Sequence, residues 1–268
     1  MWSNEKDRAL RERAAEVIPG GMYGHQSTAL LPEDYPQFFT RAEGTRITDA
    51  DGNEYIDFMC GYGPNLLGYG HPDIARVVAE QQARIDPSTG PSPLIVDLAE
   101  ALTGMISHAD WAMFCKNGAD ATMMGLMMAR AYRGRRKVLL AKNAYHGSMP
   151  WNTPRPGGVV AEDRAHFIYF DYNDPQALTD AGKQAGDDLA GIFAAPFRHD
   201  TFADQGLPDA EYARTARRLA DENDALLIVD DVRAGFRMAR DCSWETVGVR
   251  PDLSCWGKVL GNGQPISA

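Results

Sequence analysis

A run of apolar residues that ends in two carboxylates constrains this sequence more than any other feature. Leu226 is followed by Leu, Ile and Val, and then by Asp230 and Asp231. Four consecutive apolar residues are typical of a strand that is covered on both faces, as the strands of parallel sheets are. Ligands of such folds bind beyond the carboxyl ends of the strands. The run therefore predicts an α/β fold in which Asp230 lies at the edge where a site would form.

Further apolar and periodic runs predict a mostly parallel sheet flanked by helices. Strands are predicted over residues 112–115, 137–141, 167–170 and 189–195, and helices over residues 73–84, 94–106, 116–132, 175–184 and 209–223. Near the N-terminus, residues 5–17 predict a helix. The Asp51-Gly52 pair predicts an antiparallel hairpin, because Asp-Gly suits a tight turn between strands.

Lys258 lies between glycines, shortly after the apolar residues that follow the Asp230 run along the chain. Gly257 precedes it, and a turn at residues 261–263 follows. Glycine lets a backbone and a ligand approach closely, and desolvation favours the neutral amine that forms a Schiff base with a carbonyl. Taken alone, the stretch also fits a solvated surface lysine. Paired with Asp230 it fits pyridoxal phosphate, because the acid can keep the pyridine nitrogen protonated while the lysine carries the aldehyde as an imine.

Composition excludes some classes of function. The formal net charge is -10 and the pI is about 5.1, which argues against nucleic-acid binding because phosphates are neutralised by clustered Lys and Arg. The four cysteines have no Cys-x-x-Cys spacing and indicate reduced thiols rather than a disulfide framework or a zinc site, and no metal site is expected. The polar N-terminus has no signal-peptide core, and no apolar run is long enough to span a membrane. We expect a cytoplasmic protein.

A glycine turn between a predicted strand and a predicted helix indicates an anion site. Asn117, Gly118 and Ala119 open the helix, where free backbone N–H groups and the helix dipole both favour a phosphate. Many strand-to-helix turns contain glycine, so this motif alone is weak evidence for a phosphate site and needs support from other motifs.

Two segments together resemble the class III aminotransferases, which use pyridoxal phosphate. They are the residues Val-Asp-Asp-Val-Arg-Ala-Gly-Phe-Arg at 229–237 and Gly-Lys-Val-Leu-Gly-Asn-Gly-Gln-Pro-Ile at 257–266. Within that family the chain is most similar to glutamate-1-semialdehyde aminomutase and its relatives. The resemblance implies the aspartate aminotransferase-like fold (fold type I). It also implies that residues 1–58 belong to the family's small domain and residues 59–268 to its large, cofactor-binding domain.

The resemblance also assigns roles to individual residues. Lys258 would form the Schiff base and Asp230 would pair with the pyridine nitrogen. Asn117, Gly118 and Ala119 match the phosphate turn, and Tyr145 and Val232 match the residues on the two faces of the ring. Tyr62 matches an aromatic that contacts substrate, although a packed aromatic beside tight turns fits it equally well. A structural, hydrogen-bonding role is expected for His146.

The sequence departs from the family pattern in several places. Ala119 lacks the hydroxyl of the usual threonine, and Ala195 stands where many members have glutamate. Arg198 and His199, just beyond, could serve a substrate carboxylate or lie in a solvated loop. Residues 22–27 contain no arginine, unlike the aminomutase, so glutamate-1-semialdehyde is not the expected substrate. The chain also stops ten residues after Lys258, and we expect it to be truncated at its C-terminal end.

The leading interpretation is an enzyme that moves an amino group from an amine or amino acid to a keto or aldehyde acceptor, as an aminotransferase or a 2,1-aminomutase. Racemase or decarboxylase chemistry on the same cofactor is one alternative. A nucleotide-binding α/β protein and a non-catalytic fragment are others. The resemblance implies a homodimer. We also expect the 268-residue chain alone to be poorly stable, because an incomplete sheet exposes apolar faces.

Overall fold

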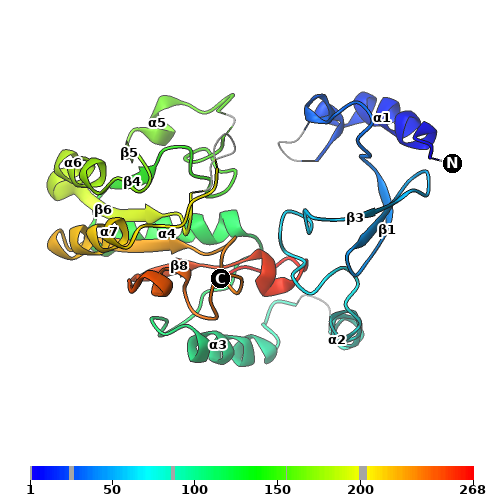
Figure 1. Ribbon diagram of the computed structural model, residues 1–268. Helices are drawn as coiled ribbons and strands as arrows, with labels where there is room; N and C mark the ends of the chain where they lie inside the picture. The colour runs from blue at the N-terminus through cyan, green and yellow to red at the C-terminus, as the bar shows by residue number, and fades with distance from the viewer. Residues whose placement is uncertain (1, 24–26, 86–87, 155, 199–203) are drawn as a thin grey trace. The chain divides into compact units, whose positions relative to one another are not determined.

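The computed structural model describes residues 2–23, 27–85, 88–154, 156–198 and 204–268 (Figure 1). The chain divides into two compact units, Met1–Pro91 and Ser92–Ala268. This division falls later in the sequence than residue 58, so the glycine-rich segment and the helix after it belong with the first unit. The predicted boundary concerns the two domains of the family and stays a prediction.

The first unit combines helices with a small antiparallel sheet. Its elements are α1 (Glu5–Val17), the short turns η1 (Pro19–Gly21) and η2 (Thr28–Leu30), β1 (Phe39–Glu43), β2 (Arg46–Asp49), β3 (Glu54–Ile56) and α2 (Pro72–Gln82). The strands pair in the order β1-β2-β3. Asp49 is 2% exposed and accepts hydrogen bonds from the Asn53 N–H at 2.8 Å and the Tyr55 hydroxyl at 2.8 Å. This carboxylate therefore stabilises the turn of the predicted hairpin.

The second unit contains a five-stranded sheet. Its elements are α3 (Leu94–Met105), α4 (Gly118–Arg133), β4 (Lys137–Ala141), α5 (Ala161–Arg164), β5 (Phe167–Phe170), α6 (Pro175–Ala185), η3 (Gly186–Asp188), β6 (Leu189–Ala194), α7 (Ala210–Glu222), β7 (Leu226–Asp230), η4 (Ser243–Val247), β8 (Leu253–Cys255) and η5 (Lys258–Gly261). The strand order is β5-β4-β6-β7-β8, and every neighbouring pair is parallel. The predicted mostly parallel α/β sheet is confirmed.

Alternating side chains give this sheet two covered faces. Leu227 and Val229 of β7 pack in one buried cluster with residues of α6 and α7, while Ile228 packs in another with residues of α4. All six residues of β6 are buried. Burying one such aliphatic side chain contributes about 1.5–3 kcal/mol. The continuous apolar runs therefore form strands in the middle layer, with α4 on one face and α6 and α7 on the other.

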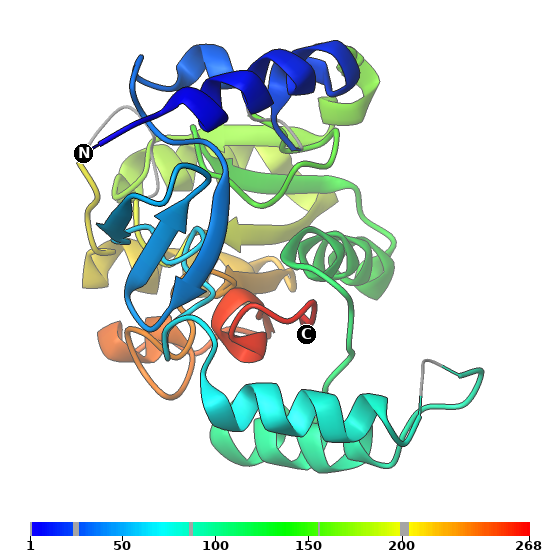
Figure 2. The same ribbon diagram turned by 90° about the vertical axis from the view of Figure 1, so that its right-hand side faces the viewer.

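Two expectations about local structure were wrong. Residues 112–115 do not form a regular strand, because only Cys115 pairs, through an antiparallel bridge to Ser267. The prolines and glycines of residues 151–164 predict a loop, but this segment contains the short helix α5. The C-terminal segment, red in Figure 2, lies beside residues 112–115, since Ser267 exchanges backbone hydrogen bonds with Cys115 while Ala268 exchanges them with Trp256.

The parallel strands bring chemically active residues to one edge of the sheet. Strand β4 leads to residues 142–147, β6 to Ala195, β7 to Asp230 and Asp231, and β8 to Lys258. The order of the strands reverses between β4 and β6, and ligands of open α/β sheets bind beyond the carboxyl ends at such a point. None of the helices within the described residues is long and apolar enough to cross a membrane.

Candidate active site

Asp230 is held by a buried histidine. The Asp230 side chain is at the end of β7 and the residue is 6% exposed. Its Oδ2 lies 2.8 Å from Nδ1 of His146, and its Oδ1 accepts the N–H of Val232 at 3.1 Å. His146 is 1% exposed and its ring contacts Trp151 and Phe193. The histidine therefore fixes the direction of the carboxylate.

The environment of His146 also selects its tautomer. Nδ1 faces the Asp230 carboxylate and so carries the proton it donates. Nε2 is buried and has no hydrogen-bond partner in the part of the chain that the structure describes. A second N–H at that position would be buried without an acceptor, which is costly. The tautomer that donates from Nδ1 fits the site, in agreement with the predicted hydrogen-bonding role.

Lys258 begins the short turn η5 with an unusual backbone. Its φ is 47°, in the left-handed region, where a non-glycine residue costs roughly 1–3 kcal/mol. Burial lowers the pKa of the half-buried Lys258 amine, and the positive charges of Arg233 and Arg237 lower it further, while Asp230 acts in the opposite direction. These effects favour the neutral, nucleophilic form of the amine.

The first turn of α4 provides donors for an anion. The Asn117 Oδ1 caps the helix by accepting the N–H of Asp120 at 3.1 Å. For the N–H groups of Gly118 and Ala119, no acceptor is found within the described residues. Both N–H groups belong to the helix end that carries the positive dipole. The geometry fits the predicted phosphate turn.

Close packing joins these segments. A Cβ added at Gly118 would lie 2.6 Å from Cγ1 of Val232, and one at Gly257 would lie 3.2 Å from the same atom. On the other side, a Cβ at Gly147 would lie 2.7 Å from that of Ala119. The α4 turn, the residues after β7, the residue before Lys258 and the Tyr145–Gly147 segment therefore meet, because three glycines let them do so.

The remaining predicted residues have different surroundings. Tyr145 is half-buried in the segment beside Ala119, and its place on a ring face stays a prediction. Tyr62 belongs to the first unit and is 46% exposed, so its contact with substrate also stays a prediction. Ala195 is buried at 3% exposure. Arg198 is exposed and bonds through its N–H to the Gly206 carbonyl at 2.6 Å, whereas His199 lies outside the described residues.

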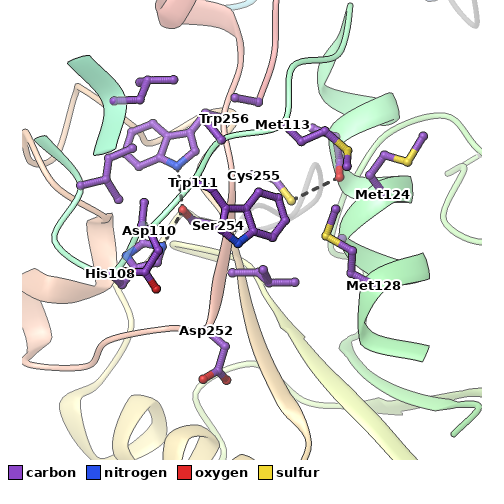
Figure 3. A pocket seen from close by; sticks show the side chains of 18 of the residues that line it. His108, Asp110, Trp111, Met113, Met124, Met128, Asp252, Ser254, Cys255 and Trp256 are labelled. Carbon is purple, nitrogen blue, oxygen red and sulfur yellow. Dashed lines mark hydrogen bonds between the residues drawn. The ribbon is translucent and has the colours of Figure 1, made fainter. Parts of the chain in front are cut away.

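A cavity of about 140 Å³ lies away from these residues, between α4, residues 108–115 and β8. Figure 3 shows the Ser254 hydroxyl between His108 and Trp256, and it is 2.8 Å from Nε2 of the histidine and 2.7 Å from Nε1 of the tryptophan. Methionines line the opposite wall. Neither Asp230 nor Lys258 borders this cavity, so it is not the candidate active site.

Asp231 is a second buried acid that the sequence left without a role. It is 1% exposed, and its Oδ2 accepts the N–H of Ser243 at 2.9 Å. Burial raises its pKa to about 6, against 3.8 for an ordinary aspartate. The folded state therefore binds the proton of the Asp231 carboxyl more tightly than the unfolded state does. The stability that this bound proton contributes is fully present below pH 3.8 and is lost as the pH rises through 6.

We therefore expect Asp231→Asn to remove a pH-dependent loss of stability. The shift from 3.8 to about 6 corresponds to about 3 kcal/mol over the whole titration, of which roughly half falls between pH 5 and pH 7.5. Denaturant unfolding near pH 5 and near pH 7.5 measures the loss in the free energy of unfolding for each protein. The parent chain should lose more stability than the variant over that interval. An equal loss in both proteins would show that this carboxyl is not the titrating group.

Substitution of Gly118 should disturb both the packing and the anion site. The added methyl group of Gly118→Ala must displace Val232 or the first turn of α4, which costs about 1–3 kcal/mol of stability. The affinity for pyridoxal phosphate should fall about tenfold or more with that displacement, since tenfold is only 1.4 kcal/mol. Gly104 in α3 provides a matched control, because a Cβ there meets no atom within 4 Å. Gly104→Ala should leave the affinity unchanged, and an unchanged affinity in Gly118→Ala would contradict the role of the turn.

Comparison with known proteins identifies related enzymes. The class-III aminotransferase family matches residues 32–268. The aminopentol aminotransferase of Sphingopyxis macrogoltabida is 59% identical over all of this chain, and glutamate-1-semialdehyde 2,1-aminomutase of Haloarcula marismortui is 32% identical over 99% of it. The chain spans 64% of the length of the first relative and 61% of the second. Its similarity to the aminotransferase thus exceeds its similarity to this aminomutase.

A solved structure shares the fold. It is the pyridoxal-phosphate internal-aldimine form of the FumI protein of Sphingopyxis sp. MTA144, which is 59% identical with a TM-score of 0.95. The match covers 97% of this chain and 63% of that one. The predicted fold type and the predicted family are both confirmed. The sequence motifs, the parallel sheet and the matched residues together establish that this chain belongs to the class III aminotransferase family.

Proposed function

We propose that the protein binds pyridoxal phosphate and transfers an amino group from an amine to a keto or aldehyde acceptor. The observation that carries this proposal is the meeting of three segments around Val232. They bring the free N–H groups of α4, the buried Asp230 and the desolvated amine of Lys258 into one site. Membership of the class III aminotransferases supports the same chemistry.

The residues present fit the cofactor. The Gly118 and Ala119 N–H groups would bind its phosphate, and a side chain at Gly118 would fill part of the space that Val232 occupies. The usual threonine hydroxyl is replaced by Ala119, so backbone donors carry more of the phosphate binding. The Asp230 carboxylate, fixed by His146, would face the pyridine nitrogen. Bound pyridoxal phosphate supplies an electron-withdrawing ring and a reactive aldehyde.

The protein's own groups then have distinct tasks. The Asp230 carboxylate would pair with the ring nitrogen, and its hydrogen bond with His146 prevents the carboxylate from turning away. Burial and the charges of Arg233 and Arg237 lower the pKa of the Lys258 amine, which favours the neutral form that can attack a carbonyl carbon. The same nitrogen, once free, can remove a proton from the carbon that bears the substrate amine and return it elsewhere.

The amino donor is best sought among amines without a carboxylate next to the amino group. A relative with 59% identity is named an aminopentol aminotransferase, so an aminopentol is the first donor to test. The departures at Ala195 and in residues 22–27 remove groups that the aminomutase pattern uses. A keto acid is the proposed acceptor.

Two half-reactions measured separately test this function. The chain loaded with pyridoxal phosphate is mixed with the donor, and the carbonyl product is measured; a keto acid is then added, and the new amino acid is measured. Transfer predicts one carbonyl product per site before the keto acid is added, and turnover only afterwards. Release of carbon dioxide, or inversion of the donor without a carbonyl product, would instead assign decarboxylase or racemase chemistry.

We further propose that the complete protein is a cytoplasmic homodimer. Apolar side chains that are exposed in the second unit support an interface there, including Val96, Trp111, Met113 and Met127, each more than 40% exposed. The four cysteines are all free thiols, as suits a reducing compartment. Sedimentation velocity should give twice the mass of one chain, whereas a monomer at micromolar concentration would contradict the proposed assembly.

A further inference from the structure

A single buried residue ties together both ends of the segment that follows β7. We call residues 232–242 the β7 exit loop. At its far end, the Asp231 Oδ2 accepts the N–H of Ser243, the first residue of η4, at 2.9 Å. Near its start, the Asp231 carbonyl accepts the N–H of Gly235 at 2.7 Å. Because Asp231 is only 1% exposed, solvent does not compete for these bonds.

The β7 exit loop is packed against the residues that carry Lys258. A Cβ at Gly235 would lie 2.5 Å from the ring of Trp256, and the Phe236 ring centroid is 4.7 Å from that of Trp256. Trp256 is 3% exposed and precedes Lys258 by two residues. Val232, at the start of the loop, packs against Gly257. The position of the loop and the position of the lysine backbone are therefore coupled.

The same loop carries two cations toward the lysine. The Arg233 guanidinium lies 5.6 Å from the centroid of the Phe197 ring and is partly desolvated. The charges of Arg233 and Arg237 lower the pKa of Lys258, and Asp230 is the acid that opposes them. The groups that face Asp231 itself are Asp230, Cys242 and Ser243. Displacement of the loop would move both arginines relative to the amine.

We infer that Asp231 is a positioning residue, whose bonds to Ser243 and Gly235 hold the β7 exit loop so that Arg233 and Arg237 stay beside the amine of Lys258. The role rests on the proposed function, in which Lys258 is the reactive amine. Asp231 acts at a distance on the reacting atoms, since its Oδ2 is bonded to the start of η4. It thereby sets how much of the lysine is neutral at a given pH.

The titration of Lys258 in the cofactor-free chain tests this role. Acetic anhydride acylates neutral amines, and mass spectrometry of the Lys258 peptide gives the rate as a function of pH. The exposed Lys183 of α6 is the internal reference. In Asp231→Ala the pKa of Lys258 should rise by about one unit, so that acylation below that pKa slows about tenfold. Asp231→Asn keeps an oxygen that can accept the Ser243 N–H and should titrate like the parent chain.

The direction of the Lys258 pKa shift distinguishes this positioning role from a direct effect of the Asp231 charge. Removal of a nearby negative charge alone would lower a lysine pKa, whereas removal of two nearby positive charges raises it. A rise in Asp231→Ala but not in Asp231→Asn supports the inference. An unchanged or lowered pKa in Asp231→Ala, or an equal rise in both variants, would overturn it. Should the alanine variant fail to fold by circular dichroism, Asp231→Ser gives the same comparison, because its hydroxyl is too short to reach the Ser243 N–H.

A separate measurement distinguishes failure of the proposed function from failure of the role inferred for Asp231. Uptake of pyridoxal phosphate by the parent chain is followed through visible absorbance. Failure of the parent chain to take up the cofactor would contradict the proposed function, whereas the acylation rates of cofactor-free Lys258 would still decide the role of Asp231.

Discussion

Replacing Lys258 with alanine is expected to lower amine transfer by at least about a thousandfold. The substitution removes both the nucleophile that attacks the cofactor aldehyde and the base that moves the substrate proton, and the proton transfer alone is worth roughly 10²–10⁴-fold. The α4 donors and Asp230 remain in place, so pyridoxal phosphate should still bind without a covalent bond. Steady-state rates measure the first effect, and equilibrium dialysis of the cofactor measures the second.

The matched control for this variant is Lys183→Ala. Lys183 is exposed, lies in α6 and pairs with Asp180 at 2.8 Å, so its loss changes the net charge equally without touching the site. The control should keep the parent rate. Comparable turnover by Lys258→Ala and the parent would mean that another group performs the chemistry.

Asp230→Asn is expected to reduce turnover by roughly 10²–10³-fold while the cofactor still binds, an effect within the range of a lost electrostatic contact in a site. The amide oxygen can still accept the hydrogen bond from Nδ1 of His146, so the geometry is kept and the negative charge is lost. Without that charge the pyridine nitrogen holds its proton less well, and the ring withdraws electrons less strongly. Rates and cofactor dissociation constants should be compared for the two proteins.

The neighbouring acid cannot easily take over this role. Asp231 follows the last residue of β7, and its carboxylate bonds to Ser243 rather than to His146. Asp180→Asn, on the exposed surface of α6, is the matched control and should keep full activity. Unchanged turnover in Asp230→Asn would show that no charge at this position is needed.

The sequence predicted the middle of the sheet well because burial on both faces demands continuous apolar runs. Strands β4 and β5 have the predicted bounds, and β6 differs from its prediction by one residue. The prediction of a strand over residues 112–115 was wrong. Their composition suits a strand, but a strand also needs a partner along its length, and pairing is found only at Cys115. A local pattern does not contain that information.

The site was predictable as a set of residues and not as a set of contacts. Glycines and polar residues after predicted strands identified Asn117, Asp230 and Lys258 as candidates, whereas Tyr145 was a candidate only through the resemblance to the family. The pairing of His146 with Asp230 joins residues 84 positions apart, which no spacing in the sequence reveals. Asp231 was visible only as the second acid of a pair, and its role depends on the path of the β7 exit loop.

Reduction of the cofactor-loaded chain with borohydride, followed by peptide mapping, tests the central claim most directly. Borohydride makes the bond between an amine and the cofactor aldehyde permanent, and mass spectrometry then identifies the modified lysine. We predict one pyridoxyl group per chain, attached to Lys258 and absent from Lys258→Ala. A pyridoxyl group on a different lysine of the parent chain, or none at all, would contradict the assignment of this site.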